Sequence, residues 1–248
     1  MDPFILENKK LPCKDKVSYG NHQLWITKDD HCRNERILNM KTDLNNELFI
    51  DMNSDNMNGM EMPMNPDANI DLRTYIRDIP DFPQPGILFR DITPLLQDPL
   101  AYRTVNDVFI TRYRSRINPH QGAPNTIQVV AAIESRGFLF ASVLAYTLGL
   151  PFVILRKKGK LPYTTLAHTY PLEYGEDTLE IHTDAFAPGS GVLLMDDLLA
   201  TGGTALASCH LIEKMGGHIV EVATVIELSD LKGRETLNSY SVFSQIVY

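Results

Sequence analysis

The sequence is poor in the residues that mark secreted and membrane proteins. It has only 3 cysteines in 248 residues, at the widely separated positions 13, 32 and 209. Such cysteines do not make the disulfide framework of a small secreted protein, which favours a reducing, cytoplasmic location. No stretch approaches the roughly 20 apolar residues of a membrane-spanning helix. The opening MDPFILENKK has an early acid and no long apolar run. We therefore expect neither a secretory signal nor a transit peptide.

Positive charge is also in deficit. Lys and Arg number 23 against 31 Asp and Glu, so the formal net charge is −8. This balance argues against nucleic acid or an anionic membrane surface as the partner. The remaining composition, 44% hydrophobic and 22% charged, is that of an ordinary globular protein. The length suits one domain, or one domain with an appendage.

Composition divides the chain near residue 66. Residues 1–65 hold seven of the nine Met and the single Trp, and they lack any sustained helical or strand period. We interpret 1–65 as a largely disordered N-terminal extension, with short ordered pieces at 24–27 and 44–52. A regulatory tail, a partner-binding segment and an alternative start all remain open for it. Residues 66–248 are expected to form the functional domain.

From residue 70 onward, helical and strand-like patterns alternate, after a proline-rich passage at 80–96. We predict helices over 70–79, 98–117, 137–150 and 204–215, and buried strands over 127–133, 151–155, 192–196 and 218–228. A hairpin is predicted over 169–182, with its turn at Glu176–Asp177. This alternation is typical of an α/β fold, a mostly parallel twisted sheet flanked by helices.

The sequence VLLMDDLLATGGT (192–204) joins a buried strand to a helix through a glycine-containing loop. The strand delivers Asp196 and Asp197 to the carboxyl edge of a parallel sheet, where ligands bind in such folds. Two glycines allow close backbone approach. The N–H groups of the loop and helix start, with the hydroxyls of Thr201 and Thr204, form a cradle for phosphate. These features together predict a site for a sugar phosphate.

A structural turn before a capped helix is the alternative, but two acids at a buried strand end would then be desolvated without benefit. The loop is neither a Walker loop nor a G-x-G-x-x-G fingerprint. It resembles the 5-phosphoribosyl-1-pyrophosphate (PRPP) motif of type I phosphoribosyltransferases, and DDLLATGGT is similar to the adenine phosphoribosyltransferase family. The resemblance implies that Asp196 and Asp197 are catalytic and hold the ribose. The 5′-phosphate residues that it implies are Ala200, Thr201, Gly202, Gly203 and Thr204.

Two further passages are suited to anions. In AIESRGFLF (132–140) a strand ends at a polar turn with Arg136 before a helix, although an Arg that caps the helix is an alternative. In RKKGK (156–160) four cations follow a strand, although a solvated charge run is the usual outcome. The family resemblance implies pyrophosphate contacts in both passages. The residues implied are Glu134, Ser135, Arg136, Arg156 and Lys160.

The proline-rich passage PDFPQPGILFRDITPLL (80–96) resembles the family's hood over the nucleobase; alone, it would be read as a surface loop. Apolar walls and backbone groups suit a flat heterocycle. The resemblance implies adenine contacts at Leu88, Phe89, Arg90 and Leu198, and Leu228 as one wall of the base site. In YPLEYG (170–175) it implies Glu173 as the proton-transfer group and Tyr174 as a cover. Pro171 departs from the family wording and removes a strand N–H donor.

The resemblance covers about residues 68–248 and implies the type I phosphoribosyltransferase fold with a small N-terminal hood. It implies Mg²⁺-dependent transfer of phosphoribosyl from PRPP to N9 of adenine, giving AMP and pyrophosphate, in a cytoplasmic homodimer that serves purine salvage. Mg²⁺ is expected to bind mostly substrate oxygens and water, with no firm protein ligand. The alternatives are a related enzyme acting on another base and a nucleotide-binding regulator of the same fold without catalysis.

Overall fold

The computed structural model describes residues 70–117, 125–171 and 175–248, together with the backbone of four strands nearer the N-terminus. The chain divides into two compact units, Met1–Asn65 and Pro66–Tyr248. The first unit has a four-stranded sheet in the order β1-β2-β4-β3. Its strands are β1 (Lys14–Tyr19), β2 (His22–Thr27), β3 (Asn39–Thr42) and β4 (Leu48–Asp51). β2 and β4 fall on the two pieces expected to be ordered.

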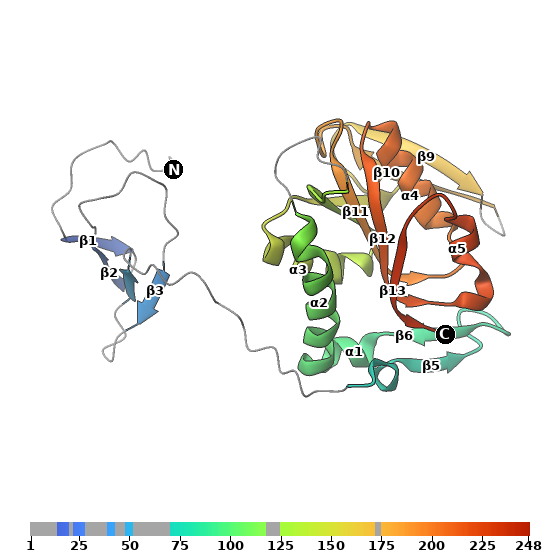
Figure 1. Cartoon of the computed structure of the whole chain (residues 1–248), viewed down its shortest axis with the longest axis horizontal. Helices are drawn as coiled ribbons and strands as arrows, with labels where there is room; N and C mark the ends of the chain where they lie inside the picture. The colour runs from blue at the N-terminus through green and yellow to red at the C-terminus, as the bar shows by residue number, and fades with distance from the viewer. Residues whose placement is uncertain are drawn as a thin grey trace. The chain divides into compact units, whose positions relative to one another are not determined.

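The second unit is built on a seven-stranded sheet in the order β13-β12-β11-β7-β8-β10-β9 (Figure 1). The first five strands of this order are parallel, whereas β10 runs antiparallel to both β8 and β9. The strands are β7 (Val129–Ile133), β8 (Phe152–Lys157), β9 (Thr165–Pro171), β10 (Glu176–His182), β11 (Gly191–Leu199), β12 (His218–Glu227) and β13 (Val242–Val247). The α/β fold with a mostly parallel sheet is confirmed.

Helices cover both faces of this sheet (Figure 1). They are α1 (Thr93–Gln97), α2 (Pro99–Tyr113), α3 (Gly137–Leu148), α4 (Gly203–Lys214) and α5 (Gly233–Thr236), with 3-10 turns η1 (Leu72–Tyr75), η2 (Arg114–Arg116) and η3 (Ser229–Leu231). Phe109 of α2 and Phe140 of α3 belong to the core on one face, and Leu211 of α4 belongs to the core on the other. The predicted helices over 98–117, 137–150 and 204–215 and the four predicted strands are confirmed within a few residues at each end. The strand predicted to be buried over 151–155 is buried only in part, because β8 alternates and Phe152 is exposed.

Local sequence explains where these helices begin and end. Asp98 accepts hydrogen bonds from the N–H groups of Leu100 and Ala101 at the start of α2, and Pro99 takes the first helical position. Gly149 ends α3 with a φ of +66°, a conformation that favours glycine. Sequence signals of this kind made the helix ends predictable.

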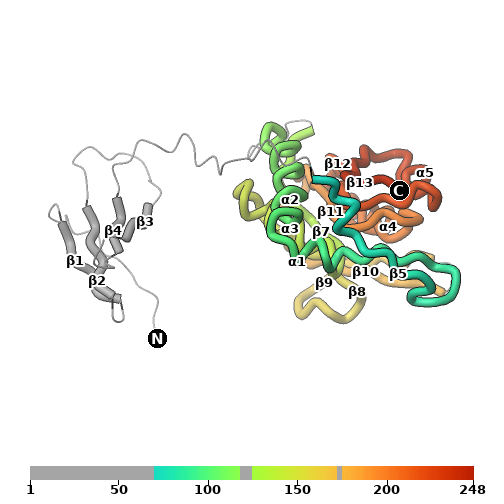
Figure 2. Tube along the Cα trace, turned by 90° about the horizontal axis from the view of Figure 1, so that it is seen from below, coloured from blue at the N-terminus to red at the C-terminus, as the bar shows by residue number. Residues whose placement is uncertain are grey.

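The hood is a two-stranded antiparallel ribbon of β5 (Arg77–Pro80) and β6 (Leu88–Asp91). Figure 2 shows it as an arm that extends from the body of the unit. At its base the carboxylate of Asp91 lies 2.6 Å from Nη2 of Arg77 and accepts hydrogen bonds from Thr93, and these hydrogen bonds lower its pKa to about 2 in spite of partial burial. The ionised Asp91 therefore fixes this end of the ribbon to the start of α1.

Three expectations need correction. The helix predicted over 70–79 is only the turn η1, because the apolar spacing of three from Leu72 to Tyr75 also fits a 3-10 helix and the chain then enters β5. Glu176 and Asp177 lie inside β10, paired with Pro171 and Tyr170, so the hairpin turn comes earlier than predicted. β13 was not predicted, because its residues are mostly half-buried and show no alternation.

Pro171 is the last residue of β9, which is the outermost strand of the sheet. Its missing N–H therefore lies where proline is tolerated in sheets.

Within the described residues, none of the helices combines the length and the apolar character that crossing a membrane would need.

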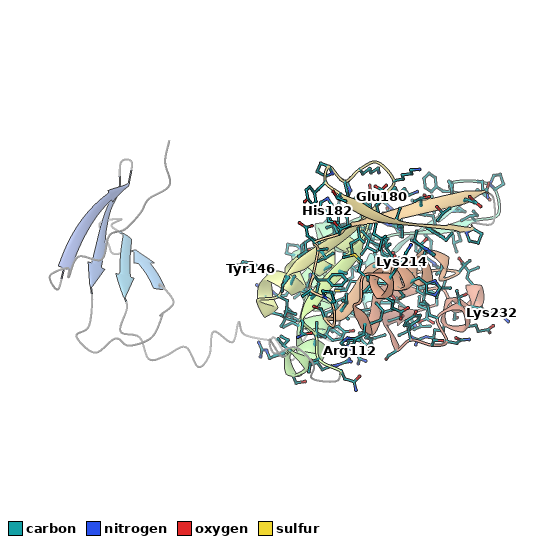
Figure 3. The ribbon with its side chains drawn as sticks, turned by 90° about the horizontal axis from the view of Figure 1, so that it is seen from above. Arg112, Tyr146, Glu180, His182, Lys214 and Lys232 are labelled. Carbon is teal, nitrogen blue, oxygen red and sulfur yellow. The ribbon has the colours of Figure 1, made fainter. Side chains whose placement is uncertain are left out.

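A buried carboxylate ties α2 to the sheet. Glu221 of β12 is 2% exposed and accepts hydrogen bonds from Arg112 (Figure 3), Tyr113, Arg116 and Ser241 at 2.7 to 3.2 Å. Burial acts to raise the pKa of Glu221, but the hydrogen bonds, led by that from Arg112, lower it to about 2. The folded state therefore favours the charged carboxylate.

We expect Glu221→Gln to lower the free energy of unfolding at pH 7 by about 3 kcal/mol, because two arginines lose their buried counter-charge. The folded pKa lies below the ordinary value of 4.5, so this contribution is present above pH 4.5 and is lost as the pH falls toward 2. The difference between the variant and the wild type, measured by urea unfolding, should narrow over that range. Glu235→Gln, at an exposed ion pair with Lys232, should change stability by less than about 0.5 kcal/mol. Equal stability of Glu221→Gln and wild type at pH 7 would contradict the prediction.

Candidate active site

A cleft of about 590 Å³ opens at the carboxyl ends of β7 and β11. This edge of the sheet is where α/β folds bind ligands. The lining residues are Phe89, Ile133, Glu134, Ser135, Arg136, Lys157, Tyr170, Asp177, Leu179, Asp196, Asp197, Leu198, Leu199, Ala200, Thr201, Gly202, Gly203, Thr204 and Ala205. The sequence motif at 192–204 and the turn at 134–136 therefore meet in one place.

Asp196 and Asp197 lie near the carboxyl end of the buried strand β11, and both line the cleft. Asp197 is 3% exposed, and its N–H donates to Oδ1 of Asp196 at 2.9 Å. Burial and the neighbouring charge of Asp197 raise the pKa of Asp196 well above its usual range. Burial also raises the pKa of Asp197, although Arg136 opposes this effect. One arginine does not fully compensate two buried acids, and Oδ2 of Asp197 has no hydrogen-bond donor; a sugar with its cation supplies both hydroxyl donors and positive charge.

The loop after these acids leads into α4. Gly202 has a φ of +83°, and its carbonyl accepts the first helical hydrogen bond, from the N–H of Leu206 at 2.8 Å. The N–H groups in the first turn of a helix have no partner within the helix. The hydroxyl of Tyr170, on β9, donates to Oγ1 of Thr204 at 3.2 Å. The loop therefore offers free backbone donors and a positioned hydroxyl, as expected for a phosphate cradle.

The turn Glu134–Arg136 joins β7 to α3 and includes a cis peptide bond between Glu134 and Ser135. Gly137 lets α3 start directly against β11: a Cβ there would lie 2.9 Å from the carbonyl oxygen of Met195. Nε of Arg136 lies 2.9 Å from Oδ2 of Asp197, at ion-pair distance but without the angle of a hydrogen bond. The Arg136 guanidinium also lies 5.2 Å from the centre of the Phe89 ring. This arginine is thus shared between the acid pair and the hood.

Glu134 gathers the cations of the 156–160 run. It pairs with Lys160, lies 3.4 Å from Nη2 of Arg156, and accepts the N–H of Lys157 at 2.9 Å. Burial acts to raise the pKa of Glu134, but these contacts, led by the one from Lys160, lower it to about 2. Arg156 and Lys160 are not among the residues that line the cleft, and Lys157 is the cation of this run that lines it. The run is not a freely solvated charge cluster.

Glu180 of β10 holds the same loop from the other side. It lies opposite Arg156 across the strands, is 8% exposed, and accepts the N–H of Gly159 at 2.9 Å (Figure 3). Gly159 has a φ of +80°, so the turn of the loop depends on glycine there. The loop 157–160 is therefore fixed by two carboxylates, Glu134 and Glu180.

The structure separates the four residues predicted to contact the base. Phe89 and Leu198 line the cleft, whereas Leu88 and Arg90 do not. Leu88 is 45% exposed. Arg90 pairs with Asp78, and its guanidinium lies 3.9 Å from the centre of the Tyr248 ring, which connects the hood to the C-terminal strand. Leu228 packs against the core and is not part of the cleft lining.

Glu173 and Tyr174 lie outside the described residues, so their predicted roles stay predictions. Seven lining residues were not singled out from the sequence: Ile133, Lys157, Tyr170, Asp177, Leu179, Leu199 and Ala205. Nζ of Lys157 lies 3.0 Å from Oδ2 of Asp177, and this pairing raises the pKa of Lys157. Lys157 belongs to the cationic run 156–160, so the sequence did contain a signal that could have marked it as a site residue. The pairing itself joins two strands and has no local signature.

The donors present suit Mg²⁺ bound largely through its substrate. The described residues contain no group of three or more His, Cys, Asp or Glu side chains that could hold a metal. They do offer two adjacent carboxylates in the cleft, and Oδ2 of Asp197 is buried without a hydrogen bond. One or two carboxylates plus substrate phosphates is the donor set that Mg²⁺ commonly takes.

Known proteins share this arrangement. Residues 94–247 match the phosphoribosyl transferase domain family. Over 179 residues the chain is 50% identical to an adenine phosphoribosyltransferase of Roseiflexus castenholzii, covering 72% of this chain and 99% of the relative. The solved adenine phosphoribosyltransferase of Thermoanaerobacter pseudethanolicus has a TM-score of 0.66 and 45% identity, covering 71% of this chain and 98% of that one. The adenine phosphoribosyltransferase of Saccharomyces cerevisiae, solved with an imino-altritol bisphosphate and adenine, has a TM-score of 0.64 and 38% identity. This match covers 70% of this chain and 96% of the yeast chain.

The fold, with its hood and its acid pair followed by a phosphate loop, defines a type I phosphoribosyltransferase. The relatives narrow this class further, because they match almost their full length at about half identity. The chain belongs to the adenine phosphoribosyltransferase family.

We expect Glu180→Ala to weaken pyrophosphate binding about fivefold, the effect of one lost hydrogen bond of about 1 kcal/mol, because the Gly159 turn loses its anchor. Glu180→Gln retains an acceptor oxygen and should bind pyrophosphate like the wild type. Isothermal titration with pyrophosphate and Mg²⁺ measures both variants. Equal affinity of Glu180→Ala and wild type would show that the loop keeps its shape without this contact.

Proposed function

We propose that the cleft catalyses Mg²⁺-dependent transfer of the phosphoribosyl group from PRPP to N9 of adenine, giving AMP and pyrophosphate. The observation that carries the proposal is that an acid pair, an N–H-rich loop, an anion-facing turn and an aromatic ring line one cleft. Each suits one part of these substrates: ribose hydroxyls, 5′-phosphate, pyrophosphate and base. The adenine phosphoribosyltransferase relatives support the choice of base.

The chain's task is to stabilise charge as the bond between C1′ and the pyrophosphate oxygen breaks and the bond to N9 forms. By analogy with glycoside cleavage, C1′ becomes cationic in the transition state. Asp196 and Asp197 hold the ribose hydroxyls and place negative potential beside that carbon. Arg136 and Lys157 in the cleft lining, together with Arg156 and Lys160 of the adjoining loop, place positive potential around the departing anion. When bound, Mg²⁺ supplies further positive charge to the pyrophosphate oxygens.

The remaining roles are orientation and proton transfer. The loop from Ala200 to Thr204 anchors the 5′-phosphate, so that binding energy remote from C1′ fixes the reacting geometry. Phe89 and Leu198 provide apolar walls for the base. Glu173 takes the proton that leaves adenine, and Tyr174 covers the site as the loop closes. These last two roles rest on the family resemblance.

We further propose that activity resides in residues 66–248 of a cytoplasmic homodimer. The relatives match about 70% of this chain but nearly all of their own length, which supports the domain assignment. Tyr146 (Figure 3) is 90% exposed, and Leu139 and Phe152 are also exposed on the α3 side of the unit. Exposed apolar side chains of this kind support an interface with a second copy.

The base is tested by competition between adenine and hypoxanthine, with PRPP and Mg²⁺ present. We expect AMP formation to dominate, because the relatives that match this chain are adenine enzymes. If hypoxanthine is turned over faster than adenine, hypoxanthine replaces adenine as the assigned substrate. Binding of PRPP without formation of any nucleotide would instead support a regulator of the same fold.

We expect Asp197→Asn to reduce kcat by a factor on the order of 10² or more, because the amide retains the shape but loses the charge that stabilises the transition state. Steady-state assays with saturating PRPP and adenine measure kcat, and thermal melting monitors the fold. Asp184→Asn, at an exposed loop position, is the matched control and should be as active as the wild type. Normal turnover in Asp197→Asn would remove the proposed role of the acid pair.

A further inference from the structure

The segment 228–237 follows β12 and carries η3 and α5, and the proposed function assigns it no role. None of its residues lines the cleft. Lys232 (Figure 3) and Glu235 form an ion pair on its exposed side, at 69% and 71% side-chain exposure. Its inner side packs against the loop 200–204, which the proposed function assigns to the 5′-phosphate. The contacts of Leu228, Gly233 and Thr236 show this packing.

These contacts reach three consecutive backbone carbonyls of the loop. The N–H of Leu228 donates to the carbonyl oxygen of Leu199 at 2.9 Å. The hydroxyl of Thr236 donates to the carbonyl oxygen of Thr201 at 2.7 Å. Between them, the carbonyl oxygen of Ala200 lies so close to Gly233 that a Cβ there would be 2.4 Å away.

The direction of these carbonyls sets the direction of the N–H groups. In a planar trans peptide, the C=O of one residue and the N–H of the next point to opposite sides. Among the described residues, the cis bonds are Phe82–Pro83 and Glu134–Ser135, so the loop peptides are trans. Carbonyls of 199, 200 and 201 that face the segment turn the N–H groups of Ala200, Thr201 and Gly202 away from it. The residues that carry those N–H groups line the cleft.

Two glycines make this close packing possible. A Cβ on Gly202 would lie 2.8 Å from the carbonyl oxygen of Gly233 and 3.0 Å from Cβ of Thr236. Gly202 therefore needs glycine both for its φ of +83° and for the approach of the segment. The backbone of the loop and the backbone of the segment are in direct contact at these two residues.

The segment is itself firmly fixed. Nε of Arg234 donates to Oε1 of Glu227 at 2.7 Å, and its Nη1 donates to the carbonyl oxygen of Val242 at 2.8 Å, which ties α5 to β12 and β13. Glu227 is 4% exposed, and Leu237 is fully buried in the core. A rigid support of this kind keeps a loop in one orientation without contacting the ligand.

We propose that the segment 228–237 is a positioning element that aims the N–H groups of Ala200, Thr201 and Gly202 at the 5′-phosphate, with Gly233 and Thr236 as its positioning residues. The proposal rests on the proposed function, since it assumes that the loop binds the 5′-phosphate. It predicts that changes in the segment lower the affinity only for ligands that carry this phosphate.

The test measures binding of ribose 5-phosphate and of pyrophosphate to the full chain by isothermal titration. Thr236→Val removes the hydroxyl at nearly constant shape and should weaken ribose 5-phosphate binding about fivefold. Thr236→Ser keeps the hydroxyl and should bind ribose 5-phosphate like the wild type. Gly233→Ala pushes on the carbonyl of Ala200 and should weaken this binding on the order of 10- to 100-fold. Pyrophosphate affinity should remain within twofold of wild type in all three variants.

Tyr240→Phe is the control for deleting a hydroxyl nearby, because Tyr240 donates to Glu213 of α4 at 3.0 Å without contacting the loop. It should bind ribose 5-phosphate like the wild type. If Gly233→Ala fails to fold, the Thr236→Val and Thr236→Ser pair still decides the question. Wild-type binding of ribose 5-phosphate by Thr236→Val, or equal losses for both ligands, would overturn the positioning role and leave the proposed function intact. A wild-type protein that binds neither ligand would overturn the proposed function and this inference with it.

Discussion

Asp196 and Asp197 lie near the carboxyl end of a strand that is buried inside the sheet, so groups from distant parts of the chain must compensate their charge. The surroundings of the cleft follow from this constraint. Gly137 lets the start of α3 approach β11, which brings Arg136 to within 2.9 Å of Asp197. Burial still raises the pKa of both acids in spite of that arginine. The compensation is incomplete, and a polar ligand with its cation can complete it.

The sequence could place the acid pair and the loop 200–204 at one site because the information for both is local. A buried strand, two acids, two glycines and a helix start follow one another in 192–204, and each has a physical meaning on its own. The same holds for Arg136 between a strand and a helix, and for Asp98 and Pro99 at the start of α2. The assignment of Phe89 to the cleft depended on family resemblance, since a proline-rich loop alone has no such signature.

The contacts between distant residues were not predictable. Glu221 meets Arg112 across 109 positions, and Arg73 donates to the carbonyl oxygen of Val247 across 174. Lys157 was one of three lysines in its run, and only its pairing with Asp177 distinguishes it. Arg156 and Lys160 were expected to contact pyrophosphate, and the structure pairs both with Glu134, whereas Lys157 lines the cleft. In each case tertiary packing selects among residues that look equivalent in the sequence.

Under the proposed function, the ion pair between Arg136 and Asp197 makes ligand binding an exchange of partners. An anion that engages Arg136 releases Asp197, and the released carboxylate can then accept hydroxyl groups from the same molecule. A lone anion leaves the acid uncompensated, and a lone sugar finds it already occupied. A sugar that carries an anionic group near its hydroxyls is the kind of ligand that satisfies both residues at once.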